Sequence, residues 1–135
     1  MRAVLDPTIL IAALISSSGT PARIVQRWLG GDFELVVSET LLRELERALA
    51  YPKLRGRISE EEADEFLTLL RRAAIVAPDP PSPPRRSADA GDDYLIALAE
   101  TELALLVSGD RHLLALAAQL PIKSTRAFLD ALAKE

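Results

Sequence analysis

Two acidic residues of the sequence lie at, or shortly after, the end of an aliphatic segment of strand type. Asp6 follows Val4 and Leu5, and Asp110 comes shortly after the aliphatic run 103–107. Short aliphatic runs of this kind, bounded by turn residues, are typical of buried strands in a parallel sheet. Because ligands of such sheets bind beyond the carboxyl ends of the strands, we expect both carboxylates at the functional edge of the fold.

Three more acids are expected near the same edge. Asp92 and Asp93 stand at the predicted start of a helix, which lies at the strand-end edge of an α/β layer. Glu44 lies one turn from Leu41 and Ala48, at the margin of an apolar helical stripe, so it should point obliquely towards the rim of the core. Each acid also has a structural interpretation. Any of the aspartates could cap a helix or hold a turn, worth about 1 kcal/mol, and Glu44 could pair with an arginine of its own helix.

Crowded carboxylates repel one another, and a bound divalent cation is the usual reason for a fold to tolerate them. The sequence has no cysteine and a single histidine, so the ligands would be carboxylate oxygens. Such ligands favour a hard ion, Mg²⁺ or Mn²⁺. A carboxylate site of this type most often serves phosphoryl chemistry, and we expect hydrolysis of a phosphodiester.

The alternation of aliphatic strands with helices predicts an α/β fold of three layers, α/β/α, around a central parallel sheet of about four to five strands. The length of 135 residues suits one domain, residues 1–135. The proline-rich segment 78–87 is expected to be a stiff surface loop inside that domain. No apolar stretch reaches membrane-spanning length and the first residues do not form a signal peptide, so we expect a cytoplasmic protein without membrane contact.

Capping residues mark the expected helix boundaries. Thr20 and Ser38 are each predicted to cap a helix, and Ser59 with Glu62 has the spacing of a capping box. The segment 53–57 is expected to be a basic connection between helices. Strands are predicted at 4–5, 33–37, 74–77 and 103–107.

The basic residues give weaker signals. The net charge is −4, which opposes phosphate binding in general, although a four-carboxylate metal site would account for a surplus of this size. Arg85-Arg86, segment 53–57 and Arg111 could contact RNA phosphates or simply mark a solvated face. His112 is more typical of a surface residue than of a general base. Trp28 lies on an apolar stripe and is expected in the core or at a dimer interface.

The sequence resembles a PIN domain in its order of motifs. Segments 4–14 and 33–45 resemble the opening half of that domain, and segments 89–99 and 106–114 resemble its closing half. The resemblance is strongest to toxin components of bacterial and archaeal toxin–antitoxin pairs, related to VapC. It implies an Mg²⁺- or Mn²⁺-dependent ribonuclease, often a homodimer, which acts on RNA and is held inactive by a cognate antitoxin protein.

The resemblance implies metal binding and catalysis by one acid from each of four segments: Asp6, Glu44, Asp92 and Asp110. It also implies that Thr8 and Ser108 are hydroxyl neighbours that orient the acids. The family commonly has Thr-Asn or Thr-Ser after the first acid, whereas this chain has Pro7, which supplies neither an N–H nor a hydroxyl. Asp93 stays open as an alternative to Asp92 for the third metal-binding acid.

Two other functions compete with the nuclease. A PIN fold that no longer cleaves could act as a binding or scaffold module; Pro7 slightly favours this, and retention of all four acids opposes it. A phosphatase could use Asp6 as a nucleophile at a strand end. Enzymes of the haloacid-dehalogenase type need a second aspartate two residues later, and this chain has Thr8 there.

Overall fold

The computed structural model describes residues 1–134 and contains one five-stranded sheet. Its strands are β1 (Arg2–Leu5), β2 (Glu34–Val37), β3 (Ile75–Val76), β4 (Leu105–Val107) and β5 (Ile122–Lys123). All pairs are parallel and the spatial order is β3-β2-β1-β4-β5. The sheet confirms the predicted α/β class, and it places β1 and β4, the strands that precede Asp6 and Asp110, side by side.

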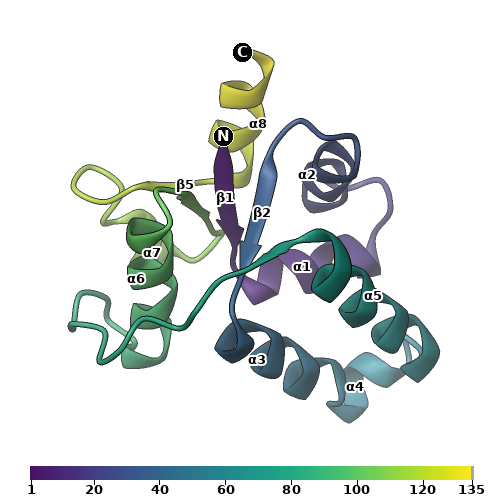
Figure 1. Ribbon diagram of the computed structural model, residues 1–135. Coiled ribbons are helices and arrows are strands. Elements are labelled where there is room, and N and C mark those ends of the chain that lie inside the picture. The colour runs from purple at the N-terminus through teal and green to yellow at the C-terminus, as the bar shows by residue number, and fades with distance from the viewer. Residues whose placement is uncertain (135) are drawn as a thin grey trace.

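Helices connect the strands and cover the sheet. They are α1 (Pro7–Ile15), α2 (Thr20–Leu29), α3 (Glu39–Leu49), α4 (Pro52–Arg55), α5 (Glu60–Ala73), the 3₁₀ turn η1 (Ala90–Asp92), α6 (Asp93–Thr101), α7 (Arg111–Leu114) and α8 (Thr125–Ala133). Helices α6 and α7 lie on one side of the sheet, and α1, α2 and α5 lie on the other (Figure 1). Helix α3 lies beyond the carboxyl end of β2, whereas both chain termini lie at the opposite end of the sheet (Figure 1).

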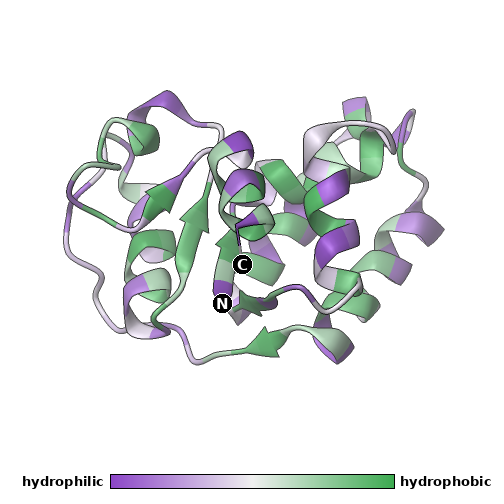
Figure 2. Ribbon diagram, turned by 90° about the horizontal axis from the view of Figure 1, so that it is seen from above, coloured by the Kyte–Doolittle hydropathy of each residue, from purple (hydrophilic) through white to green (hydrophobic). Residues whose placement is uncertain are grey.

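The sheet is buried by aliphatic residues on both faces, as parallel sheets require. Segments 3–5 and 35–37 are fully buried, and the strands carry the hydrophobic colour in Figure 2. Phe33, just before β2, packs edge-to-face on Phe128 of α8, with ring centroids 5.0 Å apart. The core therefore ties the last helix to the centre of the sheet and holds the strand ends in place.

The predicted strands at 4–5, 33–37 and 74–77 are present with ends shifted by one or two residues, and three other predictions are wrong. Ser38 caps α3, and Ser59 with Glu62 forms the capping box of α5. Thr20 is not a cap: Gly19 occupies the N-cap position, without a side-chain hydrogen bond, and Thr20 is the first helical residue. Pro52 supplies a favourable first residue for α4, so the expected basic connection is partly helical.

The third wrong boundary is the start of β4. The apolar run 103–107 was predicted as one strand, but only residues 105–107 pair in the sheet. Leu103 instead has a left-handed backbone, with φ of 53°, and its side chain is 90% exposed. It ends the preceding helix in the position where glycine is usual, so hydrophobicity alone misplaced it.

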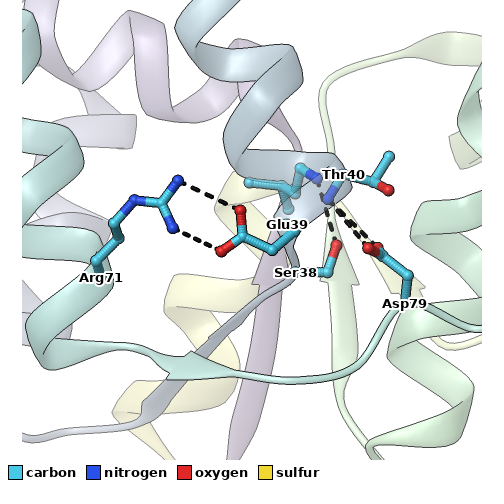
Figure 3. A network of polar contacts seen from close by, with 6 residues as sticks. Ser38, Glu39, Thr40, Arg71 and Asp79 are labelled. Carbon is cyan, nitrogen blue, oxygen red and sulfur yellow. Dashed lines mark hydrogen bonds and ion pairs between the residues drawn. The ribbon is translucent and has the colours of Figure 1, made fainter.

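The long loop between β3 and η1 is fixed to α3 at its beginning. The Asp79 carboxylate accepts hydrogen bonds from the Thr40 backbone N–H, at 3.3 and 3.4 Å, at the amino end of α3 (Figure 3). Arg71 of α5 pairs with Glu39 beside it, through contacts of 2.6 and 3.3 Å (Figure 3). These contacts link the amino end of α3, the helix that carries Glu44, to α5 and to the start of the loop.

Within residues 1–134, no single helix is long and apolar enough to cross a membrane; α1 and α2 reach that length only together, as a pair bent by 99°.

Candidate functional site

A cavity of about 510 Å³ opens at the carboxyl ends of β1 and β4. The four acids expected to gather there all line it: Asp6, Glu44, Asp92 and Asp110. Asp89 is a fifth acid in the lining, and Thr8 lines the cavity as well. The fold therefore brings together carboxylates from four separate segments of the chain, as the strand-end argument predicted.

Asp6 is the most firmly held of these acids. It is 6% exposed and forms the N-cap of α1, where its Oδ1 accepts the Thr8 backbone N–H at 3.0 Å. Its Oδ2 accepts the Ser108 hydroxyl at 2.9 Å. Pro7 has no N–H, but the first free N–H of the helix comes from Thr8, so the local support of Asp6 is intact. Thr8 supports Asp6 through its backbone, and the structure gives no such contact for its hydroxyl among the described residues.

Ser108 connects the two strand-end acids. It is fully buried at the end of β4, and the same hydroxyl oxygen that donates to Asp6 accepts the Asp110 backbone N–H at 3.0 Å. Asp110 caps α7, because its Oδ1 accepts the His112 N–H at 2.7 Å. The capping interpretation is thus correct for Asp110 and Asp6, and both still face the cavity with lone pairs to spare.

Glu44 reaches the cavity from the middle of α3. Its Oε2 accepts a hydrogen bond from the hydroxyl of Tyr94, on the first turn of α6. Burial, followed by the hydrogen bond and the charge of Glu44, raises the pKa of Tyr94 well above its usual range, so the phenol stays protonated. Glu44 was considered as a partner of Arg43 or Arg47, but its hydrogen bond in the described chain comes from Tyr94.

The pKa of Asp92 reflects the negative charge of the other acids in the cavity. It occupies the N-cap position of α6 but makes no capping hydrogen bond with its side chain. Burial, and then repulsion from Asp6, Asp89, Asp110 and Glu44, raises the pKa of Asp92 from 3.8 to about 6. The other acids of the cavity therefore lie close enough to Asp92 to oppose its ionisation.

Asp93 lies outside this group. It is 3% exposed and does not line the cavity. Its Oδ1 accepts the Ser87 hydroxyl at 2.8 Å, the Ser87 N–H at 2.9 Å and the Arg86 N–H at 3.1 Å. Burial alone would raise the pKa of Asp93, but these hydrogen bonds and the nearby Arg85 hold it below its usual range. Asp93 thus anchors the end of the proline-rich loop, and Asp92 is the member of the pair that faces the cavity.

The two arginines of the proline-rich loop, Arg85 and Arg86, each form an ion pair. The Arg85 Nε lies 3.4 Å from the Asp93 Oδ2, and Arg86 pairs with Glu100 on α6. His112 is exposed and contributes its backbone N–H to Asp110. Trp28 is 6% exposed within the hydrophobic core, as expected. Segment 53–57 and Arg111 lie outside the lining of the cavity.

The donor set suits a hard divalent cation, because it consists of carboxylate oxygens that repel one another. Among residues 1–134, no three acidic or histidine side chains stand close enough to hold one ion together. Asp6, Glu44, Asp92 and Asp110 are the residues of the cavity that would hold such an ion.

Sequence analysis alone did not single out two residues of this site. Asp89 lines the cavity and accepts the Gly91 N–H at 2.8 Å, in a turn that leads into η1. The Asp-x-Gly spacing is a turn signal, but it does not show which side of the loop faces the acids. Tyr94 gave no sequence signal for its contact, because Glu44 is 50 residues away in the chain.

The fold and the cavity together define an α/β domain with a carboxylate pocket at the carboxyl edge of a parallel sheet. Residues 2–112 match the family model of the PIN domain, and the chain therefore belongs to the PIN-domain family. A comparison with curated proteins found no match.

Solved structures with the same fold include proteins from archaea and bacteria. The chain aligns with PAE2754 from Pyrobaculum aerophilum over 100% of its own length and 91% of that chain, with a TM-score of 0.69 and 22% identity. It aligns with a chain of VapBC2 from Rickettsia felis, which was solved with a DNA fragment from the VapBC2 promoter. The alignment covers 92% of this chain and 98% of that chain, with a TM-score of 0.65 and 13% identity. The alignment with a chain of VapBC-1 from nontypeable Haemophilus influenzae covers 93% of this chain and 99% of that chain, with a TM-score of 0.62 and 17% identity. The structural neighbours thus include toxin–antitoxin complexes, and the likeness concerns the fold.

Proposed function

We propose that this PIN domain is an Mg²⁺- or Mn²⁺-dependent endoribonuclease, and that it hydrolyses phosphodiester bonds of RNA in the cytoplasm. The observation that carries the proposal is the convergence of Asp6, Glu44, Asp92 and Asp110 on one cavity. Their mutual repulsion, recorded in the pKa of Asp92, is a cost that a cation would relieve.

The acidic side chains of the cavity have two roles in this proposal: some hold the cation, and one accepts a proton. A bound Mg²⁺ or Mn²⁺ would supply Lewis acidity and lower the pKa of water. Asp6 and Asp110 are fixed by hydrogen bonds from the chain and are suited to hold the ion in one geometry. Asp92 makes no capping hydrogen bond, so its carboxylate can contact the ion and can also accept a proton from the attacking water.

Two measurements test this proposal. Wild-type protein should bind Mn²⁺ in titration calorimetry and cleave single-stranded or structured RNA only when the cation is present. Asp6→Asn and Asp110→Asn should each abolish cleavage while the circular dichroism spectrum is preserved. Asp130→Asn, an exposed change on α8, is the matched control and should cleave normally. Cleavage that persists undiminished in both pocket variants would refute the assignment.

We also propose that the protein is the toxin of a toxin–antitoxin pair and forms a homodimer. The support is the structural similarity to VapBC complexes from two bacteria. Expression of the protein alone should slow growth of a host cell, and co-expression of the neighbouring open reading frame should restore it. Light scattering after size-exclusion chromatography measures the oligomeric state; a monomer at micromolar concentration would contradict the dimer.

A catalytically weakened PIN fold that serves as a binding module is the second candidate. It is favoured by one finding: within residues 1–134, no three potential ligands are already assembled around a common point. Mn²⁺ titration separates the two functions. Absence of Mn²⁺ binding, or binding unaffected by Asp6→Asn, would favour the binding module over the nuclease.

A further inference from the structure

We propose that Tyr94 is a positioning residue for Glu44: its hydroxyl holds one carboxylate oxygen and so leaves the other for a cation in the cavity. The proposal rests on the metal-dependent function proposed above, because it concerns the same pocket. It assigns a role to a residue outside the four acids.

Glu44 depends more than Asp6 and Asp110 do on a hydrogen bond from another side chain to fix its orientation. Asp6 and Asp110 sit at helix N-caps, where backbone N–H groups fix their short side chains. Glu44 instead projects from the middle of α3 on a longer side chain, and nearby acids repel it. Among the described residues, Tyr94 is the hydrogen-bond donor that reaches it.

Tyr94 is also well placed to connect two sides of the cavity. It lies on α6, two residues after Asp92, whereas Glu44 lies on α3. The hydrogen bond therefore links α6, which begins directly after Asp92, to α3, which carries Glu44. A change in the position of α6 would move Asp92 and the support of Glu44 together.

A phenol has a chemical advantage over an arginine or lysine in this position. An arginine would orient Glu44 but would also cancel the negative charge that attracts a cation. The hydroxyl of Tyr94 is neutral, and it donates its hydrogen bond to one carboxylate oxygen of Glu44. It therefore orients the carboxylate and preserves its charge.

Tyr94→Phe removes only this hydroxyl. A hydrogen bond to a charged group is lost, so the Mn²⁺ dissociation constant should rise about tenfold. The Mn²⁺ concentration that gives half-maximal cleavage should shift by a similar factor, and kcat should recover at saturating Mn²⁺. Tyr51→Phe is the matched control, because Tyr51 is 54% exposed and outside the cavity lining. A structural defect would instead lower kcat at all Mn²⁺ concentrations.

A spectroscopic measurement tests the contact itself without activity. The chain has two tyrosines, so 3-fluorotyrosine incorporated into Tyr51→Phe protein reports on Tyr94 alone in fluorine NMR. Its resonance should move when Glu44→Gln is introduced and when Mg²⁺ is added. Asp130→Asn should leave it unchanged.

The Mn²⁺ binding and fluorine NMR measurements distinguish a failure of this inference from a failure of the proposed function. If Tyr94→Phe binds Mn²⁺ like wild type, or if Glu44→Gln leaves the fluorine resonance in place, the positioning role is refuted and the nuclease stands. If wild-type protein binds no Mn²⁺, the proposed function fails, and with it the role of Tyr94 towards a cation. If Tyr94→Phe does not fold, the response of the fluorine resonance to Glu44→Gln and Mg²⁺ decides.

Discussion

Asp92 and Asp93 are neighbours in the chain, but they lie in opposite electrostatic surroundings, and replacing each by asparagine tests that difference. The raised pKa of Asp92 means that its ionised form is unfavourable in the folded protein. A shift from 3.8 to about 6 corresponds in full to about 3 kcal/mol. Because Asp92 is only partly buried, solvent screening reduces the expected gain from Asp92→Asn to about 1 kcal/mol.

The gain should depend on pH with a definite sign. The penalty of ionised Asp92 is absent below its ordinary pKa of 3.8, grows as pH rises, and is complete above about 6. Metal-free Asp92→Asn should therefore melt ~4 °C above wild type at neutral pH. At pH values below 4 or so the difference should vanish, because wild-type Asp92 is then protonated in both states.

Asp93→Asn should have the opposite effect. The variant loses charge-assisted hydrogen bonds from Ser87 and the Arg86 N–H, and it leaves Arg85 without its partner. We expect a loss of about 2 kcal/mol at neutral pH. The pKa of Asp93 is lowered, so its contribution is present above the ordinary pKa and is lost as pH falls through the folded value.

Thermal unfolding in EDTA and in Mn²⁺, at neutral and at acid pH, measures both effects. Mn²⁺ should raise the melting temperature of wild type and Asp93→Asn, but not that of Asp92→Asn. Asp64→Asn, an exposed change on α5, is the control and should behave like wild type. If metal-free Asp92→Asn is less stable than wild type at neutral pH, the repulsion argument is wrong. If Mn²⁺ stabilises Asp92→Asn and not Asp93→Asn, the third acid has been misassigned.

Three further changes probe other parts of the molecule. Ser108→Ala removes the buried hydroxyl between Asp6 and Asp110; it should cost about 1–3 kcal/mol in urea unfolding and weaken Mn²⁺ binding, and unchanged stability would contradict this link. Leu103→Gly relieves a left-handed leucine and should stabilise the protein by about 1 kcal/mol; a loss in the same unfolding assay would show that the leucine has contacts worth more than its strain. A short fluorescent RNA should bind, by anisotropy, in Ca²⁺ but not in EDTA, because the uncompensated acids repel phosphate; tight binding in EDTA would contradict the role of the cation.

The strand-end acids could be predicted because their positions follow from local patterns. Asp6 and Asp110 each follow an aliphatic run, and parallel pairing of β1 with β4 brings the two run ends together. Glu44 also followed from a local pattern, the margin of the apolar stripe of α3. In each case the relevant geometry spans only a few residues.

The choice between Asp92 and Asp93 could not be made in this way. It depends on where the loop that carries Ser87 returns to the sheet, and no local periodicity encodes that path. The partnership of Tyr94 with Glu44 depends in the same way on how α6 packs near α3. Leu103 was misplaced for another reason: its hydrophobicity matches a strand, while its backbone ends a helix.

The contrast between Asp93 and the pocket acids explains why the cavity points to an external cation. Asp93, which is buried outside the lining of the cavity, has an arginine as its partner. Among residues 1–134, no ion pair involves any acid that lines the cavity. All of those acids except Asp92 are held by neutral groups instead: backbone N–H groups, the Ser108 hydroxyl and the Tyr94 phenol. Neutral donors fix the direction of a carboxylate and leave its charge in place, which supports the divalent-cation site that we propose.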